Sequence, residues 1–324
     1  MGTMEVLLPV LGGFGLFIYG MKIMSAGLKE AAGEQMRKVL QRATSNRFFA
    51  ATFGVILTII LNSSTASTIM VVSFVNSGLI DLVQAIAIKL GANVGTTFSG
   101  QLIAFRIDQY APFFIFVGAL MYMFIKQPKL KKLGRIILGF GLLFFGIATL
   151  SSPLRELARE PQFEAFLINF TSPVLALLAG FVFTAIVQSS TAATGILIAA
   201  HLSGVPIAFE TSAFIILGVN IGTSITTLLA SIPANRESKR AALFHIIFDI
   251  VGSIVFGTLI FIIPGILGWF EATWTEPARQ VAMFHTLYNV ATMLLFLPFI
   301  RQVACALERI VPNKELPLEE GMAN

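Results

Sequence analysis

Residues 62–68 read Asn-Ser-Ser-Thr-Ala-Ser-Thr, and residues 188–194 repeat the pattern as Gln-Ser-Ser-Thr-Ala-Ala-Thr, 126 residues further along. Each copy follows a strongly apolar stretch, residues 48–61 in the first case and 174–187 in the second. Hydroxyl and amide groups at membrane depth are costly and mark functional sites. A polar motif that occurs once in each half of a chain predicts one site built where the two halves meet.

The composition indicates an integral membrane protein. Of the 324 residues, 56% are hydrophobic and 12% are charged, whereas soluble domains carry roughly 25% charged residues. The formal net charge of +5 comes from Lys and Arg in short loops between apolar stretches, which is typical of membrane topology and not of nucleic-acid binding. The single cysteine, Cys305, excludes an intramolecular disulfide and a cysteine metal cluster. No catalytic-triad, zinc-protease or Walker pattern occurs, so we expect neither an enzyme nor a cofactor.

Two further blocks repeat at nearly the same offset. Residues 13–28 align with residues 139–154, with seven of sixteen positions identical and an offset of 126 again. Past the motifs, residues 91–97 (Gly-Ala-Asn-Val-Gly-Thr-Thr) match residues 218–224 (Gly-Val-Asn-Ile-Gly-Thr-Ser). Matched blocks in one order indicate an internal duplication, which is a known transporter architecture.

The duplication predicts the domain organisation. We expect an all-α integral membrane protein with two inverted-topology repeats, residues 1–134 and 135–263. Residues 264–324 would form an additional C-terminal transmembrane helix and a cytoplasmic tail.

Loop charges predict how the repeats cross the membrane. The stretches 48–77 and 173–202 are each interrupted centrally by a motif, and each arm is only ~14 residues long, which is typical of a re-entrant hairpin and not of a span. If both stretches return to the side they entered from, the basic loops 29–47, 126–135 and 233–240 all fall on one side, the cytoplasm. The first hairpin would then enter from the cytoplasm and the second from outside, and the C-terminus would be cytoplasmic.

The motifs have the composition of an anion site. A helix that restarts after a break presents free N–H groups and a positive dipole end, where anions bind. Two such tips meeting from opposite sides could surround a tetrahedral oxyanion with neutral donors. Alternatively, these groups only cap broken helices or cement helix packing. The candidate oxyanion ligands are Asn62, Ser63, Ser64, Thr65, Gln188, Ser189, Ser190 and Thr191.

A second set of polar residues suits a small hard cation such as sodium. The stretches 82–105 and 210–232 are long enough to cross once, and we expect the Gly-x-Asn-x-Gly-Thr pattern to break each helix in its middle. Carbonyls exposed at such breaks, together with Asn and Thr oxygens, could bind sodium, which would then act as co-substrate. The candidate groups are Asn93, Thr96, Thr97, Asn220, Thr223 and Ser224.

Ionisable residues also occur within the last predicted spans. His245 and Asp249, and likewise His285 and Asn289, are four residues apart and share a helix face. They predict cation coordination or proton coupling, or else packing pairs between the final helices. Lys89 is expected near a cytoplasmic helix end, where its ammonium can reach water.

These residues resemble a known family. Paired Gln-Ser-Ser motifs, each followed by Gly-x-Asn-x-Gly-Thr, look like those of the type II sodium–phosphate cotransporters, and the resemblance covers about residues 10–300. It implies sodium-coupled phosphate transport by alternating access. Phosphate would be held between the hairpin tips, and the hairpin-bearing domain would move like an elevator against a scaffold.

The sequence departs from that family in three respects. Asn62 stands where the family has Gln, and Asp249 stands where relatives have Asn. Many bacterial members carry a regulatory helical domain after the membrane part, and we expect it to be absent because the sequence ends at Asn324.

We therefore expect a multi-pass transporter of the cell membrane whose partners are inorganic phosphate, sodium and the lipid bilayer, without nucleic acid. The chain could form a homodimer. The alternatives are a transporter or exporter of another oxyanion, or a membrane phosphate sensor that does not transport.

Overall fold

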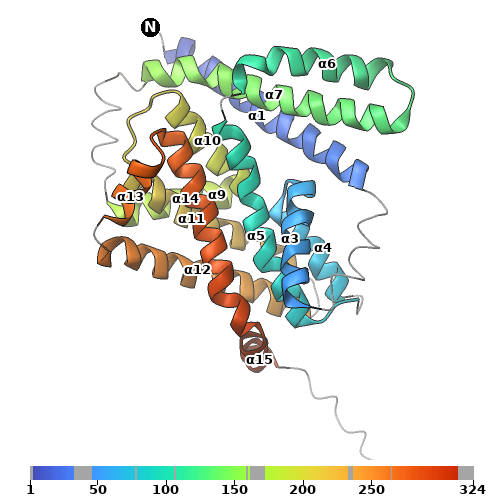
Figure 1. The fold of residues 1–324 in the computed structure, drawn as a ribbon, viewed down its shortest axis with the longest axis vertical. Coiled ribbons are helices and arrows are strands. Elements are labelled where there is room, and N and C mark those ends of the chain that lie inside the picture. Colours follow the sequence, from blue (N-terminus) through green and yellow to red (C-terminus); the bar gives the residue numbers. More distant parts are fainter. Residues whose placement is uncertain are drawn as a thin grey trace, which may run out of the picture.

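In the computed structural model of this chain, the described residues are 3–32, 46–76, 79–105, 107–157, 160, 172–232, 236–263 and 265–312. They are almost entirely helical and contain no strand (Figure 1). The α-helices are α1 (Thr3–Ala32), α3 (Arg47–Leu61), α4 (Ser64–Asn76), α5 (Leu82–Ala104), α6 (Ala111–Phe124), α7 (Pro128–Leu157), α9 (Pro173–Val187), α10 (Ser190–Leu202), α11 (Phe209–Ser231), α12 (Arg236–Ile262), α13 (Ile266–Thr273), α14 (Pro277–Phe296) and α15 (Ile300–Ile310). Two short 3₁₀ helices, η1 (Asp108–Tyr110) and η2 (Leu297–Phe299), precede α6 and α15.

Several of these helices are suited to a bilayer. Within the described residues, four stretches have the length and apolar composition needed to cross it: 7–31, 128–151, 239–262 and 277–310. Helix α5 followed by η1 and α6 could be a fifth span, with a bend of 74°. Large apolar side chains such as Phe113, Ile186 and Ile254 are exposed, as expected for a lipid-facing surface. The predicted multi-pass helical membrane protein is confirmed at this level.

The pairing of α1 with α7 is antiparallel and rests on glycines. A Cβ at Gly13 would lie 2.9 Å from the Gly146 carbonyl oxygen, and a Cβ at Gly20 would lie 2.7 Å from that of Gly139. The two helices run side by side along one edge of the molecule, beside α6 (Figure 1). Because Gly13 and Gly139 are matched positions of the duplication, as are Gly20 and Gly146, each copy meets the other in the same way.

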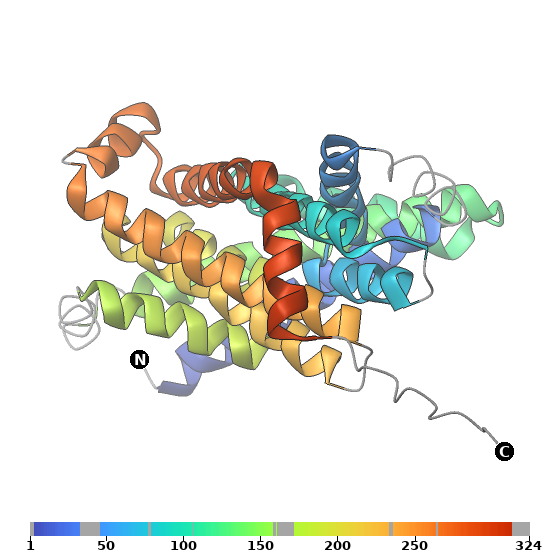
Figure 2. The ribbon, with the colours of Figure 1, turned by 90° about the horizontal axis from the view of Figure 1, so that it is seen from below.

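Another type of helix contact that depends on glycine occurs once in each half of the chain. A Cβ at Gly54 of α3 would overlap the Ile88 carbonyl of α5, and a Cβ at Gly180 of α9 would overlap the Ile215 carbonyl of α11. Conversely, Gly91 of α5 packs on the backbone of α3. The helix pairs α3/α5 and α9/α11 are therefore packed at equivalent positions. Figures 1 and 2 place the two pairs in different parts of the molecule.

The predicted breaks within α5 and α11 are wrong. Both helices are continuous through the Gly-x-Asn-x-Gly-Thr pattern, at residues 82–104 and 209–231. The glycines let two helix backbones approach each other, and helix interiors in membranes tolerate them for that purpose. The carbonyls of these segments therefore stay within the helices, and the predicted sodium site loses the part of its argument that needed exposed carbonyls.

The apolar core forms two clusters joined by α5. One contains side chains of α3, α4, α12 and α15 together with Ile88 of α5. The other contains side chains of α1, α7, α10, α11 and α14 together with Ile103 of the same helix. Residues between these two positions on α5 therefore lie where the two clusters meet.

Candidate functional site

Both motifs form short breaks between two helices. Helix α3 ends at Leu61, and Asn62 adopts the left-handed conformation (φ 47°, ψ 35°) before α4 begins. Helix α9 ends at Val187, and Gln188 adopts the same conformation (φ 56°, ψ 27°) before α10 begins. Among the described residues these two are the only non-glycine residues with positive φ. Such residues are uncommon, more so for Gln than for Asn, so the same local strain is kept in both copies.

The first serine of each motif caps the helix that follows. The backbone N–H of Ala66 donates to Ser63 Oγ at 3.1 Å, and that of Ala192 donates to Ser189 Oγ at 3.2 Å. These are ordinary N-cap bonds, so the capping alternative accounts for at least part of the role of Ser63 and Ser189.

The second serine of each motif has a different environment. Ser64 and Ser190 are the first residues of α4 and α10 and are buried. Within the described part of the chain, their hydroxyls have no hydrogen-bond partner. Thr191 is also buried, whereas nothing is described for the side chain of Thr65. The two free serine hydroxyls, each at a helix N-terminus, are the donors that an anion could use.

The residues at the two breaks differ in their side-chain contacts. Asn62 is 9% exposed, and its Oδ1 accepts a hydrogen bond from Ser99 Oγ of α5. Its Nδ2 is buried and has no partner among the described residues. The Gln188 side chain is exposed. The first break is therefore held by a side-chain contact that the second break lacks.

Neighbouring residues of α5 approach both motifs. Ser99 binds Asn62, and the next residue, Gly100, faces α10, since a Cβ there would lie 3.6 Å from Thr194 Cγ2. The Thr194 hydroxyl is buried without a partner in the described structure. Helix α4 in turn contacts α11. The described residues contain no hydrogen bond that joins one motif directly to the other. Two adjacent residues of α5 therefore each lie against one of the two motifs.

The site residues predicted from the sequence did not include Ser99. A signal was available, because Thr226 occupies the matching position of the second repeat and both residues follow their Gly-x-Asn-x-Gly-Thr pattern at the same distance. A repeated hydroxyl at a repeated distance would have added this position to the candidates.

The predicted sodium residues lie buried on α5 and α11. Most of their donors bind a carbonyl of their own helix: Thr96 that of Ala92, Thr97 that of Val94, Asn220 that of Ile216, Thr223 that of Val219 and Ser224 that of Ile221. Hydroxyl lone pairs and the Asn220 amide oxygen are not used by these donations. Asn93 differs from the others because its amide contacts another helix.

That contact joins Asn93 to a buried polar cluster. Asn93 Nδ2 donates to Asp249 Oδ1 at 3.0 Å, and His245 Nε2 lies 3.1 Å from Asp249 Oδ2, without the geometry of a hydrogen bond. His245 Nδ1 lies 2.9 Å from Thr227 Oγ1 of α11. Lys89 of α5 is also buried and interacts electrostatically with Asp249. Its predicted position near water is wrong, because helices α3, α4 and α12 pack around this part of α5.

The second predicted pair is arranged differently. His285 and Asn289 of α14 are buried, and Asn289 Nδ2 donates to the His285 carbonyl at 2.8 Å and not to its ring. Both ring nitrogens of His285 and the amide oxygen of Asn289 have no partner within the described residues. The two side chains do not form the predicted His–amide pair, and three polar atoms are left to bind something else.

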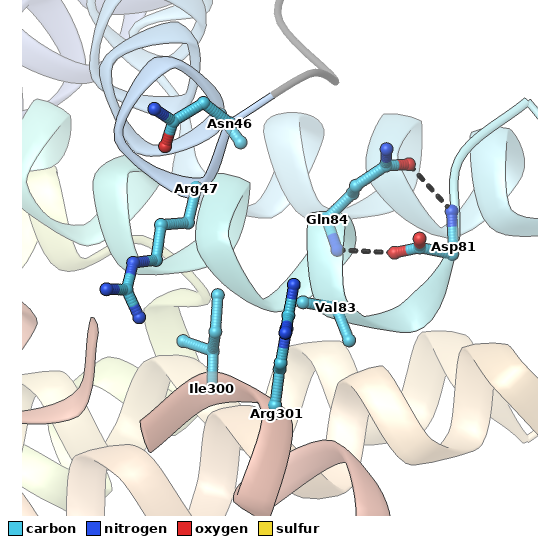
Figure 3. A pocket seen from close by; sticks show the side chains of 8 residues that line it. Asn46, Arg47, Asp81, Val83, Gln84, Ile300 and Arg301 are labelled. Carbon is cyan, nitrogen blue, oxygen red and sulfur yellow. Dashed lines mark hydrogen bonds between the residues drawn. The ribbon is translucent and has the colours of Figure 1, made fainter. Parts of the chain in front are cut away.

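A cavity of about 450 Å³ lies elsewhere (Figure 3). It opens at the N-terminal end of α3, the end opposite to Asn62, beside the start of α5 and of α15. None of the predicted site residues lines it. Asp81 and Gln84 in its wall cap α5 through reciprocal hydrogen bonds. The lining residues are Asn46, Arg47, Ala50, Asp81, Val83, Gln84, Ile300 and Arg301.

Comparisons with known proteins identify relatives. The family model described as Na+/Pi-cotransporter matches residues 16–152 and again residues 148–265. "Uncharacterized protein YqeW" of Bacillus subtilis (strain 168) is 31% identical over 301 residues, which are 92% of this chain and 96% of that protein. No solved structure matches the chain.

Two other relatives have names that refer to phosphate. "Putative inorganic phosphate export protein YjbB" of Escherichia coli (strain K12) is 28% identical over 312 residues, which are 96% of this chain and 57% of that protein. "Sodium-dependent phosphate transport protein 2A" of Rattus norvegicus is 30% identical over 106 residues, which are 32% of this chain and 17% of that protein.

Proposed function

The chain belongs to the Na+/Pi-cotransporter family, and from this premise we propose that it carries inorganic phosphate across the cell membrane, coupled to sodium, by alternating access. The family and the named relatives are phosphate transporters and not enzymes. The chain itself is a multi-pass helical membrane protein of that family.

The observation that carries the proposal is the position of α5 between the motifs. Ser99 contacts the first motif and Gly100 faces the second. Phosphate would bind between the starts of α4 and α10, where the buried residues Ser64 and Ser190 offer hydroxyls at helix N-termini. Neutral donors and two helix dipoles suit an oxyanion.

We further propose inverted repeats with two re-entrant hairpins. Helices α3 and α4, and likewise α9 and α10, have 15 and 13 residues, and each is too short to cross a bilayer that needs about 20. The antiparallel packing of α1 against its counterpart α7 supports an inverted relation between the halves. A reporter fused to the C-terminus, active only in the cytoplasm, would test the topology. An inactive reporter on a fusion protein that is present in the membrane would contradict it.

We propose coupling to sodium because phosphate carries negative charge across the membrane potential. One elementary charge crossing 100 mV corresponds to ~2.3 kcal/mol, so phosphate enters a negative cell interior only with cations or another driving force. We propose the oxygens of Asn220 and of its neighbouring hydroxyls on α11 for sodium. Asn93 is left out of this proposal because its amide is bound to Asp249. Binding two or more sodium ions with each phosphate would offset the anion's charge.

The second candidate is phosphate export, which the name of the Escherichia coli relative favours. Outward movement of an anion is driven by the membrane potential and needs no sodium. The two functions therefore differ in what drives them, although they use the same phosphate site.

Reconstituted liposomes separate these functions. Labelled phosphate should accumulate when a sodium gradient is imposed, and it should not accumulate when choline replaces sodium. Equal movement in both solutions, driven by a potassium diffusion potential, would favour export. Phosphate binding by calorimetry without any flux would favour the sensor. Arsenate and sulfate as competitors would define which oxyanion is carried.

A further inference from the structure

Lys89 is an unusual residue for the interior of a membrane protein. Its side chain is 4% exposed, and Nζ has no hydrogen-bond partner among the described residues. A buried charge costs much more than a buried neutral group unless it is compensated. Helices α3, α4, α10 and α14, which all pack on α5, contain no acidic residue, and Glu308 of α15, which also packs on α5, is exposed. Compensation for the ammonium must therefore come from another helix.

That helix is α12. Lys89 and Asn93 are one turn apart on α5, and Asn93 donates to Asp249 Oδ1 at 3.0 Å. Lys89 interacts electrostatically with Asp249 and with His245. It forms no close ion pair with the carboxylate within the described structure. The ammonium thus compensates the charge of Asp249 without occupying the carboxylate.

One oxygen of that carboxylate is still available. Asp249 is fully buried, and its Oδ2 has only the poorly aligned contact with His245. A buried carboxylate oxygen beside an amide is the kind of ligand that hard cations take. The cluster therefore has the composition of a cation site, and it already contains a cation in the form of a side chain.

We propose that the Lys89 ammonium supplies internally the positive charge that a sodium ion would otherwise bring to Asp249, and so keeps sodium out of this cluster. The inference deepens the proposed function and rests on it, because it assumes that sodium reaches the polar interior. The charges of Lys89 and Asp249 cancel. A sodium ion added beside them would leave an uncompensated charge and would be repelled by the ammonium.

Removing the ammonium should create a sodium site. Lys89→Met keeps much of the side-chain volume and leaves the buried carboxylate of Asp249 without its counterion, which is strongly unfavourable. At the same sodium concentration, the purified variant should bind one more sodium ion per protein than the wild-type protein. Radioactive sodium in equilibrium dialysis, with choline as the replacement ion and without phosphate, measures this directly.

Three variants make the result specific. Asp249→Asn in the Lys89→Met background should abolish the extra site, because the carboxylate is its main ligand. Lys89→Arg keeps a cation and should bind sodium as the wild-type protein does. Lys22→Met removes an exposed lysine of α1 and should change nothing. This last variant controls for the overall loss of one positive charge.

Two outcomes would overturn the proposal. One is a folded Lys89→Met protein with no additional sodium bound. The other is an additional site in Lys89→Arg. If Lys89→Met unfolds in choline and is restored by sodium, the proposal is supported, and Lys89→Arg decides the question if sodium does not restore folding. Because no phosphate is present, these results are independent of sodium-driven phosphate uptake, which tests the proposed function on the wild-type protein.

Discussion

The two helix–break–helix units, α3/α4 and α9/α10, share a backbone and differ in their side chains. Both end their first helix in a left-handed residue, begin the second with a serine cap, and pack through one glycine on a long helix. In the first unit, Thr58 Oγ1 donates to Ser67 Oγ at 2.8 Å. In the second, Ala193 stands in place of that serine, and the Thr184 hydroxyl is buried without a partner in the described structure.

The left-handed residues at the two helix breaks also differ in their side-chain contacts. Asn62 is buried and bound to Ser99, whereas Gln188 is exposed. The comparison teaches that the duplicated backbone is fixed by close packing, which tolerates little change, while polar contacts have diverged. The first unit is tied to α5, and the second keeps polar groups that a ligand could use.

The largest expected effect tests whether the two backbones are equivalent. Gly54→Ala and Gly180→Ala each place a methyl group into a carbonyl of the facing helix, so each should destabilise the protein by about 3 kcal/mol or more. Thermal unfolding in detergent and the yield of folded protein measure this. Gly12→Ala and Gly15→Ala are the controls, since no atom lies within 4 Å of a Cβ at either position. If only one of the two buried sites is sensitive, the units are not equivalent.

The next effect concerns function and should be the same in both units. Ser64→Ala and Ser190→Ala each remove a hydroxyl from the proposed phosphate site, and losing one hydrogen bond to a charged ligand costs about 1.5–3 kcal/mol. Phosphate uptake at low concentration should therefore fall roughly ten- to hundredfold in each variant, with unchanged thermal unfolding. Ser151→Ala on α7, whose hydroxyl binds its own helix, serves as control. Normal uptake in one variant would confine the site to the other motif.

A third pair of variants should change stability in opposite directions. Thr58→Val breaks the hydrogen bond to Ser67 and should destabilise the protein by about 1 kcal/mol. Thr184→Val removes a buried hydroxyl that has no partner in the described structure, so it should stabilise the protein by about 1 kcal/mol. Both are read from unfolding midpoints in the same detergent. Equal shifts of one sign would mean that the second threonine has a partner after all.

The smallest effect is expected at the breaks themselves. Gln188→Gly relieves the left-handed strain, worth about 1–2 kcal/mol. The greater freedom of glycine in the unfolded chain offsets about 0.4–1 kcal/mol of this gain, so the net stabilisation should be about 0.8 kcal/mol. Asn62→Gly loses the contact with Ser99 and should lower stability. Chemical denaturation of each variant and of the wild-type protein, between the same folded and unfolded states, resolves such differences in the free energy of unfolding. A stabilised Asn62→Gly protein would show that the contact contributes little.

Much of the fold could be predicted because the internal duplication is visible as a constant spacing between matched residues. The two motifs, 126 residues apart, predicted where both helix breaks lie. The predicted lengths of the hairpin arms agree with the lengths of α3, α4, α9 and α10. The continuity of α5 and α11 could not be predicted in the same way, because glycine serves both to break helices and to bring them close. Gly91 serves the second purpose, since it lies against the backbone of α3.

The site could be predicted only in part, for a related reason. The motif residues were recognisable because they are polar within apolar stretches. The contact of Ser99 with Asn62 spans 37 positions, and that of Asn93 with Asp249 spans 156. Such contacts depend on how helices pack and not on local pattern. For this reason Lys89 was expected near water, although it lies in the polar cluster of Asp249.

The position of α5 between the two motifs has a consequence for affinity. Each motif alone offers a few neutral donors, which would hold an oxyanion weakly in water. Because adjacent residues of α5 lie against both motifs, a phosphate held at the proposed site by one motif would meet the other at a high effective concentration. The pair would then act as a chelate, in which two modest half-sites give one strong one. Its strength would be set by the span of α5 at Ser99 and Gly100, and any movement that tilts this helix would release the anion by separating the halves.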